Sequence, residues 1–121
     1  KESVSVPYDA SFYSTTAKHY SNLYFGASLK ALCVLAEKKN YQFVGCSSNG
    51  VNAFFIRKDV AGNIRSIDCS SGYNKSRTRE SRDVNGKLTF ISGQARLNVI
   101  GEMDVVDIET GKVKKIKDLE Q

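Results

Sequence analysis

The sequence predicts an α/β chain with one main helix and a mostly antiparallel, β-rich sheet. Two observations lead to this prediction. A single helical pattern lies between Gly26 and Lys39, and short runs that alternate apolar and polar residues, separated by Gly and Asn turns, fill most of the remaining chain. The 121 residues, 40% hydrophobic and 26% charged, are enough for one small domain or domain fragment with a modest core.

The first 22 residues predict a strand end followed by a long loop. Val4 to Val6 alternates apolar and polar side chains, and Pro7 then ends the strand. The helix follows, because its apolar residues recur every three or four positions and form one stripe. Lys38 and Lys39 suit the negative end of a helix, and Asn40 tolerates the left-handed closing conformation. The stripe consists of Leu29, Leu32, Cys33 and Ala36.

A β-hairpin is predicted directly after the helix. Tyr41 to Cys46 alternates and contains aromatic and β-branched residues, and the Asn49-Gly50 pair is a strong hairpin-turn signal. Val51 to Arg57 is then expected as the antiparallel partner, and Ile64 to Cys69 as a further, half-exposed strand.

The second half of the chain is predicted to be a loop followed by strands. Ser70 to Asn85 has almost no apolar residues, which favours an exposed, mobile loop. After the Asn85-Gly86 turn, alternating patterns return. Strands are predicted at Lys87–Ser92, Ala95–Ile100 and Met103–Ile108, then a turn at Glu109–Lys112 and a last short strand through Val113 and Ile116.

Composition argues against several classes of protein. The longest apolar-leaning stretch, Leu29 to Ala36, is far shorter than the roughly 20 residues of a membrane span, so no membrane partner is expected. Cys33, Cys46 and Cys69 are odd in number and form no C-x-x-C pair, which argues against a disulfide framework and a zinc site. We therefore expect no metal and a reducing, cytoplasmic setting. The opening Lys1, without a leader, indicates an excised or processed piece.

Part of the chain resembles a known family. The run Leu23 to Leu32, followed by Lys39 to Cys46 and Asn49 to Arg57, is similar to a run near the end of FkbM-like proteins related to S-adenosylmethionine-dependent methyltransferases. The resemblance extends over roughly Val4 to Asp59. It implies the last crossover helix, sixth strand and antiparallel seventh strand of a Rossmann-like methyltransferase fold, with residues 60–121 as a β-rich extension.

The same resemblance implies that the cofactor site lies outside this chain. In the family, that site is built from the first strand, its glycine-rich turn and an acidic residue that ends the second strand. The chain contains no such segment. We therefore expect S-adenosylmethionine to be bound by the full-length parent, through an N-terminal half that is this chain's partner, and not by this chain alone. The segment would complete the sheet and shape the acceptor side without catalysing the reaction itself.

The resemblance also places candidate substrate-side residues. Ligands of open α/β sheets bind beyond the carboxyl ends of strands, where the hairpin turn and the loop ahead of the helix should lie. Hydrogen-bonding and aromatic side chains in these loops would suit a sugar or another polar acceptor. No catalytic residue is assigned, although His19 is the one neutral base candidate. The substrate-side candidates are Tyr8, His19, Tyr24, Ser48, Asn49 and Asn52.

Two alternative hypotheses remain open. The net charge of +5 and a basic loop with Tyr73 interleaved favour a module that binds a polyanion, although no recognisable nucleic-acid motif is present and nucleic acid is not expected as the partner. Exposed strand edges, as at Lys87 to Ser92 and Ala95 to Ile100, could instead pair two copies into a homodimer. The anion-binding candidates are Lys75, Arg77, Arg79 and Arg82.

Overall fold

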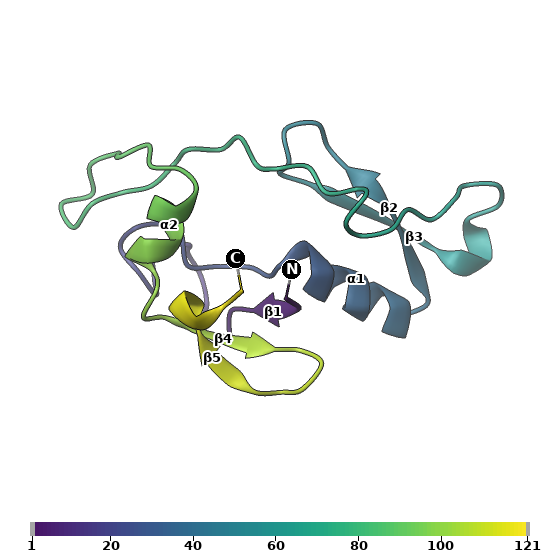
Figure 1. The fold of residues 1–121 in the computed structure, drawn as a ribbon, viewed down its shortest axis with the longest axis horizontal. Coiled ribbons are helices and arrows are strands. Elements are labelled where there is room, and N and C mark those ends of the chain that lie inside the picture. The colour runs from purple at the N-terminus through teal and green to yellow at the C-terminus, as the bar shows by residue number, and fades with distance from the viewer. Residues whose placement is uncertain (1, 121) are drawn as a thin grey trace. The chain divides into compact units, whose positions relative to one another are not determined.

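The computed structural model describes residues 2–120, which form a small α/β structure with two antiparallel sheets and one main helix (Figure 1). The chain divides into two compact units. Unit 2 is the continuous segment Ser28–Thr78, and unit 1 combines the residues up to Ala27 with those from Arg79 onward. The change of character predicted near residue 59 therefore falls inside unit 2.

Unit 2 begins with the predicted helix, α1 (Leu29–Lys38). Ser28 caps it, because its Oγ accepts a hydrogen bond from the backbone N–H of Ala31 at 3.1 Å. The helix starts later than the predicted Gly26, whose φ of 79° is not helical. Asn40 closes the helix as predicted, with a φ of 61° and its N–H donating to the carbonyl of Glu37 at 3.2 Å.

The predicted antiparallel hairpin is confirmed. Strands β2 (Tyr41–Cys46) and β3 (Ala53–Arg57) pair in register Phe43 to Phe55, with a bulge between Phe43 and Gly45. Phe43 is buried, and its ring centroid lies 5.4 Å from that of Phe55. The second strand starts two residues later than predicted because the turn continues to Asn52, whose carbonyl accepts from the Ser47 N–H at 2.9 Å.

The prediction of a strand at Ile64 to Cys69 is wrong. The segment carries no regular strand, although it runs beside β2 (Figure 1). One backbone hydrogen bond joins it to β2, from the Ile67 N–H to the Phe43 carbonyl at 2.9 Å. The Gln42 side-chain amide donates to the Ile64 carbonyl at 2.7 Å, so a side chain replaces a ladder bond. Alternation was present, but pairing stops because the bulge in β2 breaks the regular ladder.

Unit 1 contains a three-stranded antiparallel sheet of order β1-β4-β5, formed by Val4–Ser5, Asp104–Asp107 and Val113–Lys115. These strands agree with the patterns at Val4, Met103 and Val113. A buried cluster holds the unit together, and the Tyr24 hydroxyl within it donates to the Asp104 carbonyl at 2.5 Å. The buried members of this core are Tyr24, Ile100, Val105 and Ile116.

Two predictions of strands in unit 1 are wrong. Ala95–Ile100 is expected as a strand, but the structure has helix α2 (Gln94–Val99) there. The prediction failed because six residues are too few to distinguish the period of a strand from that of a helix. Lys87–Ser92 forms only an isolated bridge, between Arg82 and Leu88. The last predicted strand ends at Lys115, where a 3₁₀ turn (Ile116–Asp118) buries Ile116 in the core.

The loop from Ser70 to Asn85 contains no helix or regular strand, as predicted, yet Ser81 within it is fully buried. Its hydroxyl lies 2.7 Å from that of Thr89 and accepts from the Ile91 N–H at 3.2 Å. We expect Ser81→Ala to destabilise unit 1 by about 1–3 kcal/mol, because the part-buried Ile91 N–H loses the hydroxyl oxygen that accepts its hydrogen bond. Urea denaturation measures this loss. Ser76→Ala, in an exposed part of the same loop, is the control and should change the unfolding midpoint little.

No helix among residues 2–120 combines the length and the apolar character that crossing a membrane requires.

Candidate functional site

The turn between β2 and β3 is fixed by side chains. Ser47 Oγ donates to Asn49 Oδ1 at 2.6 Å, and the same oxygen of Asn49 accepts from the Val51 N–H at 3.2 Å. The Asn52 N–H donates to Ser47 Oγ at 3.1 Å. Serine and asparagine close such turns because their short side chains bond to the nearby backbone. The carboxyl end of β2 therefore carries an ordered turn rather than a frayed one.

A second segment, residues 73–77, packs against this turn. The Arg77 N–H donates to the Asn49 carbonyl at 3.1 Å, and the Asn74 side-chain amide donates to the Ser47 carbonyl at 3.1 Å. A Cβ added at Gly50 would lie 2.5 Å from the Asn74 carbonyl oxygen, so the two backbones approach closely only because residue 50 is glycine. We call the surface formed by residues 47–52 and 73–77 the turn surface.

The turn surface combines candidates from two hypotheses. Ser48, Asn49 and Asn52 are expected on the substrate side, and Lys75 and Arg77 in a basic loop, and all five lie in unit 2 on adjoining segments. The predictions of their roles remain predictions. Sequence patterns did not indicate that the two groups adjoin.

Several side chains of the turn surface are available to a ligand. Ser48 and Asn52 are exposed and make no hydrogen bond through their side chains to any residue between 2 and 120. Within the same described range, Lys75 and Arg77 are exposed and have no carboxylate partner. Tyr73 is 58% exposed. The surface thus offers a hydroxyl, an amide, an aromatic ring and two positive charges.

Charge is divided unequally between the two units. Unit 2 contains eight Lys and Arg against three Asp and Glu, so it carries the whole net charge of +5, while ten against ten leave unit 1 neutral. The acidic side chains of unit 2 are already engaged: Glu37 bonds to Lys58 at 2.6 Å and Asp59 to Arg57 at 2.6 Å. The third, Asp68, accepts hydrogen bonds from the Ser70 hydroxyl and from the Ser70 N–H, the latter at 3.0 Å, and these bonds lower the pKa of its carboxyl.

The remaining substrate-side candidates lie in unit 1. Tyr8 is 92% exposed, whereas Tyr24 is buried in the core. His19 Nδ1 lies 2.8 Å from the Ser21 hydroxyl, and its ring centroid is 4.4 Å from that of Tyr20. Burial lowers the pKa of His19, which favours the neutral imidazole. Among residues 2–120, no carboxylate forms a hydrogen bond with this ring, so the arrangement of a base oriented by an acid is not seen here.

The other two basic candidates also belong to unit 1. Arg82 is committed to local contacts, because its guanidinium donates to the Gly86 carbonyl at 2.8 Å and to Glu80 at 3.4 Å. Arg79 lies just beyond the boundary of unit 2. The predicted four-residue basic cluster is therefore divided, with Lys75 and Arg77 in one unit and Arg79 and Arg82 in the other.

The three cysteines lie together in unit 2 as half-buried thiols. Burial and a hydrogen bond with Cys69 raise the pKa of Cys33 to about 12. We therefore expect Cys33 to react slowly with iodoacetamide at pH 8 in the folded chain, because the thiolate is the nucleophile, and to react readily in urea. Mass spectrometry of time points measures this, and fast labelling of the folded chain would contradict it.

Among residues 2–120, no three His, Cys, Asp or Glu side chains are grouped to hold a metal ion.

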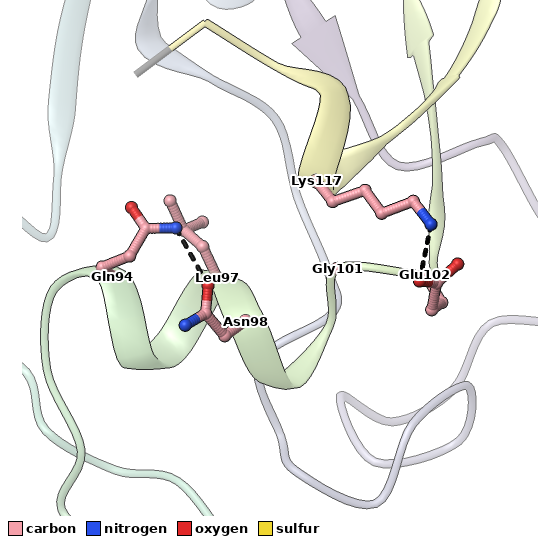
Figure 2. A pocket seen from close by; sticks show the side chains of 6 residues that line it. All are labelled: Gln94, Leu97, Asn98, Gly101, Glu102 and Lys117. Carbon is pink, nitrogen blue, oxygen red and sulfur yellow. Dashed lines mark hydrogen bonds and ion pairs between the residues drawn. The ribbon is translucent and has the colours of Figure 1, made fainter.

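Unit 1 has a concave site that sequence patterns missed (Figure 2). It encloses about 250 Å³, and its polar groups bond to one another: Gln94 Nε2 donates to Asn98 Oδ1 at 3.0 Å, and Lys117 Nζ to Glu102 at 2.7 Å. It could not be found from sequence because the segment that forms α2 reads as a strand. Its self-satisfied polar groups offer a ligand little. The lining residues are Gln94, Leu97, Asn98, Gly101, Glu102 and Lys117.

Comparison with protein-family models, with curated proteins and with solved structures found no match to this chain.

Proposed function

We propose that this chain is the C-terminal segment of an S-adenosylmethionine-dependent methyltransferase-like protein, where it completes the sheet and shapes the acceptor side without catalysing transfer alone. The single observation that carries the proposal is the order helix, strand, antiparallel strand in α1, β2 and β3 (Figure 1). That order, with its Asn-Gly turn, is the one implied by the resemblance of residues 4–59 to FkbM-like proteins.

The pairing of β3 supports the proposal. In an inserted antiparallel strand, both edges have a partner in the complete sheet. Here β2 and β3 form a two-stranded sheet, so among residues 2–120 one edge of β3 pairs with no strand. Phe54 on β3 is 52% exposed, although strands with aromatic side chains are usually covered. The parent's remaining strands, in its N-terminal half, would cover this edge.

The polar turn beyond β2 supports the assignment to the acceptor side. In open α/β sheets, ligands bind outside the carboxyl ends of the strands, and the turn surface follows the carboxyl end of β2. Its exposed Ser48 and Asn52 can bond to hydroxyl groups of a polar acceptor.

Calorimetric titration tests the proposal. S-adenosylmethionine and S-adenosylhomocysteine are titrated into this chain and into the full-length parent. We expect heat of binding only with the parent. Binding by the isolated chain would place the cofactor site here and contradict the proposal, and absence of binding by both proteins would contradict it in favour of a binding module.

A further inference from the structure

We propose that the turn surface binds the anionic group of a phosphorylated or carboxylated sugar. The proposal rests on the proposed function in one respect, since it identifies this sugar as the acceptor class. The binding itself depends on residues of unit 2 alone.

Positive charge is concentrated in unit 2. Unit 2 carries the chain's entire net charge, and each of its three acidic side chains already has a partner. Lys75 and Arg77 are exposed without a carboxylate partner among the described residues. Two unneutralised cations on residues two positions apart in the chain attract an anion, and they do so most strongly at low salt.

The segment that carries the two cations is fixed against the turn. Residues 74–77 are held to the turn by two hydrogen bonds of 3.1 Å, from the Arg77 N–H to Asn49 and from the Asn74 amide to Ser47. The backbone that carries the two cations is thus ordered before a ligand arrives, which reduces the entropy lost on binding. A guanidinium can bond to two oxygens of a phosphate or carboxylate, and an ammonium adds a point charge.

The chemistry of the neighbouring groups favours a sugar over a bare anion. Ser48 and Asn52 present an exposed hydroxyl and amide with no partner through their side chains in the described chain, and these groups match sugar hydroxyls. Tyr73, 58% exposed, supplies an aromatic face of the kind that covers the apolar side of a ring. A nucleic acid would need a longer basic track, whereas Arg82 is already bonded to Gly86 and Glu80.

The test follows backbone amide signals of the ¹⁵N-labelled 121-residue chain by NMR while glucose 6-phosphate, glucuronate, neutral glucose or a single-stranded oligonucleotide is added in separate titrations. We expect saturable shifts confined to residues 47–52 and 73–77 with one or both anions, and none with glucose. Comparison of the two anions identifies phosphate or carboxylate as the preferred group. The double variant Lys75→Gln/Arg77→Gln should bind about tenfold more weakly. The matched control is Lys38→Gln/Lys39→Gln, which removes equal charge from the same unit.

Each other outcome overturns the proposal. Equal weakening by both double variants would mean attraction to net charge rather than to this surface. Absence of saturable shifts, or shifts only with a single-stranded oligonucleotide, would exclude a sugar anion as the ligand. A dispersed spectrum for each variant shows that it is folded. Because no S-adenosylmethionine is present, failure here leaves the proposed methyltransferase origin intact, and failure of the calorimetric test leaves the anion site intact.

Discussion

Replacement of Ile100 by alanine is expected to lower the stability of unit 1 by about 2–5 kcal/mol, the usual cost of removing a large aliphatic side chain from a core. Ile100 is 7% exposed and packs with Tyr24, Val105 and Ile116. Small domains are stable by only about 5–15 kcal/mol, so this loss is a substantial part of the stability of the unit. Urea titration followed by NMR signals of β4 and β5 measures it.

The control for this prediction lies on helix α2, three residues before Ile100. Leu97 has the same number of carbon atoms as Ile100, but it is 37% exposed. Leu97→Ala should therefore cost about 1 kcal/mol or less, since part of its side chain is already in water. Equal losses from the two variants would show that Ile100 is not a core residue, and would contradict the packing described for unit 1.

Ile100 also shows where local patterns stop being sufficient. The run Ala95–Ile100 alternates well enough to suggest a strand, and six residues are too few to separate period 2 from period 3.6. Ile100, the residue that caps the end of helix α2, packs in the core with Tyr24 and Ile116, which are distant in sequence, and local patterns do not contain this packing. By contrast, α1 was predictable because its apolar stripe extends over two turns and Asn40 marks its end.

The candidate site was predictable in its parts but not as a whole. The Asn49-Gly50 turn and the basic residues Lys75 and Arg77 are visible as local signals. Their contact depends on a hydrogen bond between positions 28 residues apart, from the Arg77 N–H to the Asn49 carbonyl. It also depends on the close approach of the two backbones at Gly50. No local pattern encodes such a contact, so the sequence alone predicts two separate groups of residues.

Gly50→Ala is expected to detach residues 74–77 from the turn and to destabilise unit 2 by about 3 kcal/mol. A Cβ at this position would lie 2.5 Å from the carbonyl oxygen of Asn74 and from the carbonyl carbon of Lys75. These are backbone atoms, so the segment itself must move. The loss combines about 1 kcal/mol for alanine at a φ of 70° with about 1 kcal/mol for each of two hydrogen bonds.

Gly62→Ala separates the two contributions. Gly62 also has a positive φ, 55°, but a Cβ there has nothing within 4 Å, so this variant should lose only the conformational part, about 1 kcal/mol. Hydrogen exchange at the Arg77 amide gives the sharper measurement, because that N–H bonds to the Asn49 carbonyl. Exchange should accelerate in Gly50→Ala and stay unchanged in Gly62→Ala. If both variants leave the Arg77 amide equally protected, residues 74–77 are not held by the turn, and the ordered anion site loses its structural basis.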